Sequence, residues 1–335
     1  MTDYGELIKE IDCSSGVLPD NFYALEQPLV LRGLVSHWPL VKRSIESNQS
    51  VVNYLVENYN GAPVSAFLAK SEANGRIFYN ENVDGFNFVQ SEVYLDDALN
   101  KLVEFNDQPE PPMFYIGSLE INKHLPGLLN ANHIEIINDS VRKSIWLGNR
   151  SIVAPHFDFP DNLACCVIGE RHFTLFPPEQ LENLYVGPLD FTPAGQAISM
   201  VDLKQTDFEK YPKFAEALHA SKTALLQPGD AIFIPSMWWH AVESLSTLNG
   251  LVNYWWRNTP AYLGVPNNAL LHAILSIRQL PKQQRKAWQN IFNHYVFESS
   301  DEMYDHLPQK TKALQSKMDE TTARKLRAKL LNNLK

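Results

Sequence analysis

Three residues of this 335-residue sequence have types and a spacing suited to binding a metal ion. His156 and Asp158 form a His-x-Asp pair inside a run typical of a β-strand, where residues i and i+2 project from the same face. His240 follows a Pro-Gly-Asp turn signal, an apolar strand-like run and two tryptophans. Two imidazoles and one carboxylate make up the facial triad of non-haem Fe(II), which leaves coordination positions open for a co-substrate and dioxygen.

Each of these segments also has a simpler interpretation. A His-x-Asp pair occurs by chance or as a plain hydrogen-bonded pair, and a histidine beside two tryptophans can be a core residue. Zinc is the competing metal, because imidazole and carboxylate suit it too, but structural zinc takes four ligands and often thiolates. Cys165 and Cys166 are neighbours on one predicted strand, so they face opposite ways and form a poor chelating pair.

Short strands are the elements that must position these residues. From Met113 onward, apolar runs bounded by Gly, Pro, Asn or Asp recur, from MFYIGSL at 113–119 to GLVNYWW at 250–256. This pattern favours a β-sandwich or barrel over βαβ units, interrupted by a partly helical insert at 178–221. After Pro266 the chain turns helical, with candidate helices at 267–280 and 281–295.

Composition bounds the class of protein. Hydrophobic residues at 44% and charged residues at 20% are typical of a globular chain. The net charge of −9 disfavours a general nucleic-acid or anionic-membrane binder, although eight Lys/Arg against two Asp/Glu in 309–335 could contact RNA or an acidic partner, or form a solvated helix. Three cysteines cannot build a disulfide framework, and no window is apolar enough for a membrane span. We expect a cytoplasmic protein.

A set of ordered motifs resembles the JmjC-type, cupin-like (cupin 8) 2-oxoglutarate oxygenases. Within these, the sequence looks similar to the branch that contains the asparaginyl hydroxylase of hypoxia-inducible factor, over roughly 15–265. The motifs are Pro28-Leu-Val-Leu-Arg-Gly-Leu34, Trp38-Pro39, Trp146-x-Gly148, His156-x-Asp158, Asn162, Gly169-Glu-Arg171, Leu175-Phe-Pro-Pro178, Pro228-Gly-Asp230, Ile234-Pro, Trp238-Trp-His240 and Asn253-Tyr-Trp255.

The resemblance implies a mainly β fold with helical additions. Its core would be a double-stranded β-helix, the cupin or jelly-roll architecture, at 113–265. An α/β extension of one sheet would occupy 1–112. The helical segment at 266–335 would make a homodimer, since relatives dimerise through such helices.

The resemblance also implies a chemistry for the predicted metal site. His156, Asp158 and His240 would bind Fe(II), and 2-oxoglutarate would be the co-substrate. The chain would then be a dioxygenase that hydroxylates a protein or peptide side chain, with succinate and CO2 as co-products. The alternatives are a hydroxylase of a small amino-acid-like molecule or of a tRNA base.

Five further residues would bind the co-substrate if the resemblance holds. Tyr115 and Arg171 fall where relatives contact its C5 carboxylate. Asn162 and Asn253 match asparagines that line the co-substrate or oxygen pocket. Trp255 matches an aromatic residue near the iron.

Two positions depart from the family pattern. Arg171 stands where this branch usually has a lysine; a guanidinium can bind a carboxylate through two parallel hydrogen bonds. Arg257, on the same strand face as Asn253 and Trp255, is the alternative anchor. Val153 stands where relatives frequently have a threonine that bonds to the co-substrate. Absence of that hydroxyl would weaken co-substrate binding by on the order of 1 kcal/mol. These departures are the best support for a rival reading, a catalytically silent metal-binding cupin.

Overall fold

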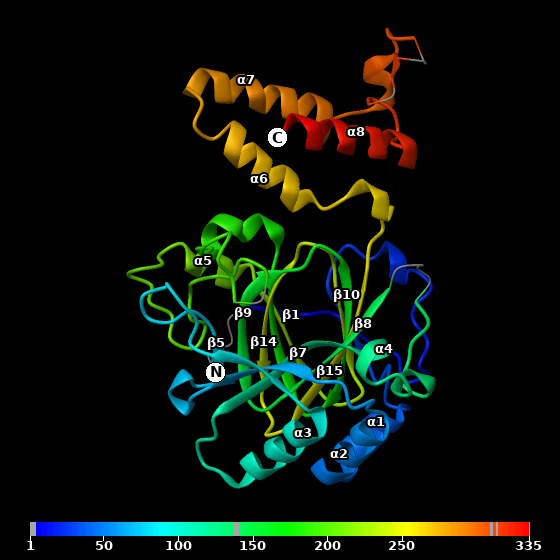
Figure 1. Cartoon of the computed structure of the whole chain (residues 1–335), viewed down its shortest axis with the longest axis vertical. Coiled ribbons are helices and arrows are strands. Elements are labelled where there is room, and N and C mark those ends of the chain that lie inside the picture. The colour runs from blue at the N-terminus through cyan, green and yellow to red at the C-terminus, as the bar shows by residue number, and fades with distance from the viewer. Residues whose placement is uncertain (1–4, 137–140, 194, 309–310, 313, 335) are drawn as a thin grey trace. The chain divides into compact units, whose positions relative to one another are not determined.

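The chain divides into two compact units, Met1–Arg257 and Asn258–Lys335 (Figure 1). The structure is a computed structural model, and it describes residues 5–136, 141–193, 195–308, 311–312 and 314–334. The boundary at Arg257 lies close to the predicted one at 265.

The first unit is built mainly from strands. They are β1 (Glu6–Leu7), β2 (Glu10–Asp12), β3 (Leu29–Arg32), β4 (Val64–Ala69), β5 (Arg76–Ile77), β6 (Val89–Val93), β7 (Met113–Glu120), β8 (Arg142–Gly148), β9 (Ser151–Phe157), β10 (Asp161–Ile168), β11 (Arg171–Phe176), β12 (Lys222–Leu226), β13 (Ala231–Ile234), β14 (Trp239–Ser244) and β15 (Asn249–Trp256). Every apolar run predicted as a strand from residue 113 onward is therefore a strand.

The described strands form two sheets. One has nine strands in the order β2-β3-β13-β10-β15-β8-β7-β4-β6, and the other has six in the order β1-β12-β11-β14-β9-β5. Strands β8, β10, β13 and β15 thus lie in the first sheet and β9, β11, β12 and β14 in the second, with antiparallel pairing throughout this core. This is the predicted double-stranded β-helix.

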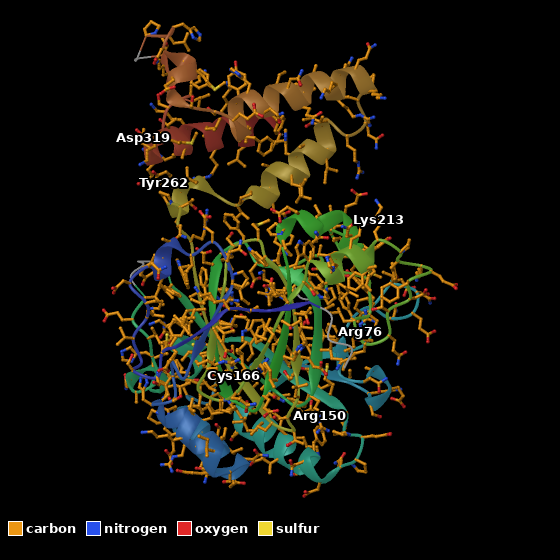
Figure 2. The ribbon with its side chains drawn as sticks, turned by 180° about the vertical axis from the view of Figure 1, so that it is seen from behind. Arg76, Arg150, Cys166, Lys213, Tyr262 and Asp319 are labelled. Atoms are coloured by element: carbon orange, nitrogen blue, oxygen red, sulfur yellow. The ribbon has the colours of Figure 1, made fainter. Side chains whose placement is uncertain are left out.

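Side chains from both sheets fill the space between them (Figure 2). The interior cluster, as we call it, includes Phe173 and Leu175 from one sheet and Ala164, Cys166 and Leu251 from the other. Because strand side chains alternate, Trp239 packs outside the six-stranded sheet against Phe176, and the next residue, His240, faces inward.

Helices and turns cover the outer faces of the first unit. The helices are α1 (Pro39–Glu46), α2 (Asn48–Glu57), α3 (Leu95–Glu104), α4 (Ile121–His124) and α5 (Phe214–His219). The 3₁₀ helices are η1 (Phe22–Ala24), η2 (Ser71–Ala73), η3 (Phe105–Asp107), η4 (Leu128–Asn130) and η5 (Pro178–Leu184). Helices α1 to α3 pack on the outer face of the nine-stranded sheet, and α5 with η5 packs outside the six-stranded one.

The N-terminal 112 residues extend both sheets, whereas the sequence predicts an extension of one. Strands β2, β3, β4 and β6 lie at the two edges of the larger sheet, and β1 and β5 lie at the edges of the smaller one. The reason is pairing over long range: β1 pairs in parallel with β12, matching Glu6 with Lys222. Such a pairing leaves no local pattern in the sequence.

The second unit is helical, as predicted. It contains α6 (Pro266–Ser276), α7 (Lys282–Phe292), α8 (Glu320–Asn333) and the turns η6 (Ala261–Leu263), η7 (Asn293–Phe297) and η8 (Asp301–Tyr304). Tyr262, labelled in Figure 2, ties the start of the unit to its last helix, because its hydroxyl donates to the Met318 carbonyl at 3.1 Å and its own carbonyl accepts from Arg327 at 2.7 Å. Asp319 caps α8 by accepting from the Thr322 amide at 2.7 Å.

Two predictions from composition can be compared with the structure. Cys13, Cys165 and Cys166 are all buried, free thiols. Within the described ranges, no helix is long and apolar enough to cross a membrane. The cytoplasmic location remains a prediction.

Candidate metal centre

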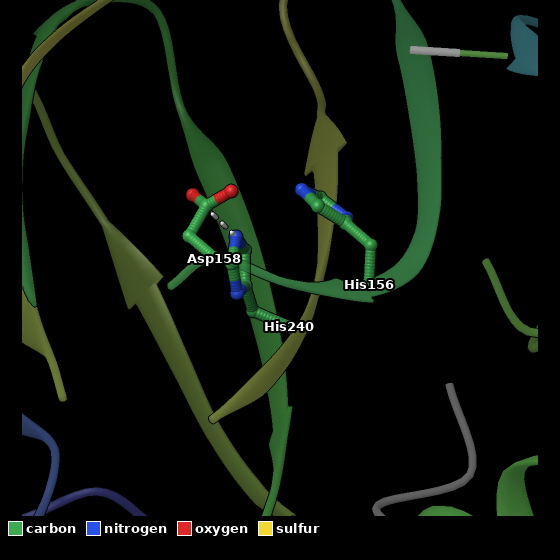
Figure 3. A group of neighbouring side chains, drawn as sticks. All are labelled: His156, Asp158 and His240. Carbon is green, nitrogen blue, oxygen red and sulfur yellow. Dashed lines mark ion pairs between the residues drawn. The ribbon is translucent and has the colours of Figure 1, made fainter. Parts of the chain in front are cut away.

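Strand pairing brings the two predicted histidine ligands together. His240 on β14 lies directly opposite His156 on β9 in the antiparallel register, and their ring centroids are 4.3 Å apart. Asp158 follows β9 by one residue and turns its carboxylate toward both rings (Figure 3). Residues far apart in the chain thus meet at one point.

The three side chains form a potential metal site. Their ligand atoms all lie within 4.8 Å of one another, and His240 Nε2 is 3.8 Å from Asp158 Oδ2. Among the residues that the structure describes, no other group of three His, Cys, Asp or Glu side chains has this proximity. The donor set of two imidazoles and one carboxylate matches the Fe(II) facial triad, as the sequence predicts.

Each histidine is oriented by a hydrogen bond from its ring to a backbone carbonyl. His156 Nδ1 lies 2.9 Å from the Ala154 carbonyl, and His240 Nδ1 lies 3.1 Å from the Trp238 carbonyl, in both cases two residues upstream. A carbonyl oxygen only accepts, so each Nδ1 carries the proton. In the neutral form of each ring, Nε2 is then the atom that keeps its lone pair, and this is the atom that binds a metal.

The environment of His240 keeps this imidazole neutral. Burial, reinforced by the neighbouring His156, lowers the pKa of His240 to about 4, and the nearby Asp158 opposes the shift only in part. At neutral pH, the 3.8 Å approach to Asp158 is therefore not an ion pair. It is the approach of two potential metal ligands.

Asp158 is fixed from two sides. Trp255 Nε1 donates to Asp158 Oδ2 at 3.1 Å, and the backbone amide of Met237 donates to the Asp158 carbonyl at 2.9 Å. Met237 itself adopts a left-handed φ of 69°, which is uncommon for a residue with a side chain. The strained turn before β14 thus holds the end of β9 in place. Trp255 thus contacts the candidate metal site through Asp158, and its role near a metal stays a prediction.

Arg171 places a guanidinium inside the same barrel. It begins β11, is only 2% exposed, and has no hydrogen-bond partner among the described residues for its buried Nε and Nη2 atoms. Burial lowers its pKa from the usual value, and the adjacent Tyr115 and Cys166 oppose this shift. Burial also raises the pKa of Tyr115 to about 12, so the phenol stays protonated.

A buried guanidinium without a carboxylate partner is costly, because desolvation of the charge is not compensated. Its orphaned donors therefore indicate an anionic ligand in the barrel. The C5 carboxylate of 2-oxoglutarate has the charge and planar shape that a guanidinium binds. The residues present fit this co-substrate.

Arg257, the alternative anchor, is placed differently. Its guanidinium carbon lies 4.8 Å from the centroid of the Phe159 ring, and the residue is only partly buried. Full burial beside a phenol favours Arg171 for the anchoring role.

The two predicted pocket asparagines contact each other. Asn253 Nδ2 donates to Asn162 Oδ1 at 2.7 Å, across the β10–β15 pair, and both residues are at most 3% exposed. Asn253 Oδ1 has no partner among the described residues and is an available acceptor.

Comparisons with known proteins agree with this geometry. The sequence profile of a family described as "Cupin-like domain" matches residues 15–262. The chain is 26% identical to "Jumonji C domain-containing protein 5" of Drosophila melanogaster over 243 residues, which is 69% of this chain and 55% of that protein. It is 24% identical to "Lysine-specific demethylase 8" of Xenopus tropicalis over 246 residues, 71% of this chain and 49% of that protein.

A third similarity is shorter. The chain is 33% identical over 106 residues to "tRNA wybutosine-synthesizing protein 5" of Danio rerio, which is 32% of this chain and 29% of that protein. The chain thus spans about half the length, or less, of these relatives.

The match over most of the first unit places this chain in the cupin-like JmjC family. Members of this family use Fe(II) and 2-oxoglutarate and are typically 2-oxoglutarate-dependent oxygenases. The family and its cofactors are therefore those predicted from the sequence. The particular similarity to the asparaginyl hydroxylase of hypoxia-inducible factor remains a prediction.

Sequence reasoning missed some parts of the site. The carbonyls of Ala154 and Trp238 orient the histidines. The only sequence signal for this role is that each of them lies two residues before its histidine. Trp146 belongs to a recognised motif, but the pattern gives it no role.

Proposed function

We propose that this chain is an Fe(II)- and 2-oxoglutarate-dependent dioxygenase that hydroxylates a protein or peptide side chain. The carrying observation is the convergence of His156, Asp158 and His240 within 4.8 Å, in the same barrel as a buried guanidinium whose Nε and Nη2 have no partner among the described residues. Both halves of a metal and keto-acid site are therefore available.

The residues have distinct roles in this proposal. His156, Asp158 and His240 hold the iron, and Trp255 fixes the carboxylate among them through its 3.1 Å hydrogen bond. When bound, iron with 2-oxoglutarate supplies the oxidation of a C–H bond by dioxygen, coupled to formation of succinate and CO2.

The co-substrate has its own anchors. Arg171 and the protonated Tyr115 bind its far carboxylate. Asn162 and Asn253 present amide groups beside it. Because all four are almost fully buried, water is excluded from the anchored end of the molecule, which strengthens each hydrogen bond.

A polypeptide substrate is favoured by charge. The chain carries a net charge of −9, which opposes extended contact with a nucleic acid. One relative bears the name of a lysine-specific demethylase, which is consistent with a side-chain substrate. A small amino-acid-like molecule is the second candidate, and a tRNA base is the third, since another relative is named for tRNA wybutosine synthesis.

The test is turnover of the co-substrate followed by product analysis. Purified full-length protein with Fe(II), ascorbate and 2-oxoglutarate should release succinate, and release should increase when a peptide mixture is added. A peptide that gains one oxygen atom supports hydroxylation, whereas formaldehyde release identifies demethylation. Protein that binds Fe(II) but forms no succinate with any of the three substrate classes would establish the catalytically silent cupin instead.

We also propose that the helices at 266–335 contribute to a homodimer. In support, α6 and α7 have no buried residues, and Leu270, Leu271 and Leu275 on α6 are exposed. Removing 266–335 should convert a dimeric elution volume to a monomeric one in size-exclusion chromatography with light scattering. A full-length chain that is already monomeric would refute this role.

A further inference from the structure

The indole of Trp146 is a polar group for which the proposed function has no use. Trp146 lies on β8, opposite Leu251 of β15, and packs against the interior cluster. Its Nε1 is buried and has no hydrogen-bond partner among the described residues. A phenylalanine would fill similar space without burying an unpaired donor, so the N–H itself needs a reason.

The neighbours of Trp146 are the residues of the proposed co-substrate site. Its ring centroid lies 6.0 Å from that of Tyr115 and 5.8 Å from that of Trp255. It therefore stands between the phenol beside Arg171 and the indole that bonds to Asp158. Trp146 also packs in one hydrophobic cluster with Tyr115 and Val153.

Val153 lacks a hydrogen-bond donor at a position where relatives frequently have one. A threonine is frequent at this position in the resembling family, where its hydroxyl contacts the co-substrate, and valine offers no donor. The indole of Trp146 packs in the same cluster as this methyl-only side chain. Val153 thus lacks a donor, and Trp146 brings an unpaired donor to the same hydrophobic cluster.

Two other tryptophans show that an unpaired indole N–H is not by itself evidence of a ligand-binding role. Trp38 and Trp256 also have buried Nε1 atoms without partners among the described residues. Both belong to the cluster between the nine-stranded sheet and the outer helices, away from the barrel interior. Of these three tryptophans in the described part of the chain, only Trp146 combines the unpaired donor with a ring contact to Tyr115.

We infer that Trp146 is a co-substrate-binding residue, whose Nε1–H donates to a carboxylate of 2-oxoglutarate in place of the hydroxyl that Val153 lacks. This inference rests on the proposed function. An indole N–H donates only, so it cannot turn an acceptor lone pair toward the anion as a hydroxyl can. Together with Arg171 and Tyr115, it gives the site a set of donors that selects a dianionic keto acid.

The experiment measures co-substrate binding without turnover. Full-length protein is loaded with Mn(II), and the affinities for 2-oxoglutarate and for N-oxalylglycine are measured by calorimetry. Trp146→Phe should weaken both by about tenfold or more, as expected for one hydrogen bond to a charged group. Trp256→Phe, which also deletes a buried and unpaired indole N–H, should leave both affinities unchanged.

A second variant tests the substitution of one donor for the other. Val153→Thr should restore most of the lost affinity in the Trp146→Phe background and add little to the wild-type chain, because the two donors serve one carboxylate. Affinity for Mn(II) alone should be the same in all of these proteins.

The outcomes separate the inference from the function on which it rests. Equal co-substrate affinity in Trp146→Phe and wild type would overturn the inference and leave the proposed function intact. An equal loss of co-substrate affinity in Trp256→Phe would also overturn the inference alone. The same holds if Trp146→Phe loses as much affinity for Mn(II) as it loses for the co-substrate. A wild-type protein that binds Mn(II) but neither keto acid nor analogue would overturn both.

Discussion

Replacing Arg171 should change stability and binding in opposite directions. The guanidinium is 2% exposed, and two of its nitrogens have no partner among the described residues. Arg171→Met keeps the apolar stem and removes the charge. Because an unsatisfied buried polar group costs about 1–3 kcal/mol, the ligand-free variant should be more stable than wild type by about that amount.

Ligand should reverse the order of the two proteins. At a 2-oxoglutarate concentration of about 100 times its dissociation constant, wild type gains about 2.7 kcal/mol and the variant gains nothing. Thermal unfolding with Mn(II), with and without co-substrate, measures both effects, at roughly 2–4 °C for each kcal/mol in a domain of this size.

Arg76→Met is the matched control. Arg76, labelled in Figure 2, pairs with Asp202 at 3.3 Å and stacks 3.5 Å from the centroid of Phe78, so its loss should not raise stability and should not affect the ligand shift. If ligand-free Arg171→Met is less stable than wild type, the guanidinium is satisfied in the apoprotein and our reasoning is wrong. If the variant is still stabilised by 2-oxoglutarate, Arg257 becomes the anchor.

Three further predictions concern the metal end of the site. Asp158→Ala should abolish iron-dependent succinate formation, whereas Asp202→Ala, which removes a carboxylate from a surface ion pair, should retain it; equal losses would contradict the assignment. Trp255→Phe removes the 3.1 Å hydrogen bond to Asp158 and should weaken Mn(II) binding about 10–100-fold in calorimetry, with Trp256→Phe unchanged. The metal-free protein should lose stability as pH falls from 6.5 toward 4, because unfolding lets His240 take up a proton that its folded pKa of about 4 excludes. The loss is at most about 3 kcal/mol, and urea unfolding of His240→Gln should show a shallower pH dependence.

The strands that carry the site could be predicted because their signals are local. Alternating apolar residues bounded by turn residues identify the runs that become β9 and β14, and the His-x-Asp spacing fixes two ligands on one face. His240 could be named as a candidate ligand from its residue type and context, but nothing within its own segment says that β14 pairs with β9. Its convergence with the other two ligands was supported only by the match to the facial triad and by the resemblance.

The parts that escaped prediction depend on non-local contacts. Edge strands such as β1 are two or three residues long and exist only because a distant strand offers its backbone. The orientation of the Trp146 indole depends on which neighbours Tyr115 and Trp255 become after folding. A one-dimensional pattern records which side chains are apolar, and it does not record which donors are left without partners.

The pairing of β9 with β14 limits where insertions and deletions can be tolerated during evolution. His156 and His240 meet because they are paired directly in the antiparallel ladder, next to a shift of register between the His240 and Val242 pairs. A further loss or gain of one residue beside either histidine, with no bulge to absorb it, would turn that imidazole to the outer side, where Phe157 and Trp239 pack. Length changes next to either histidine should therefore abolish metal binding. Tolerated indels should fall in the long excursion at 178–221 between the two halves of the barrel.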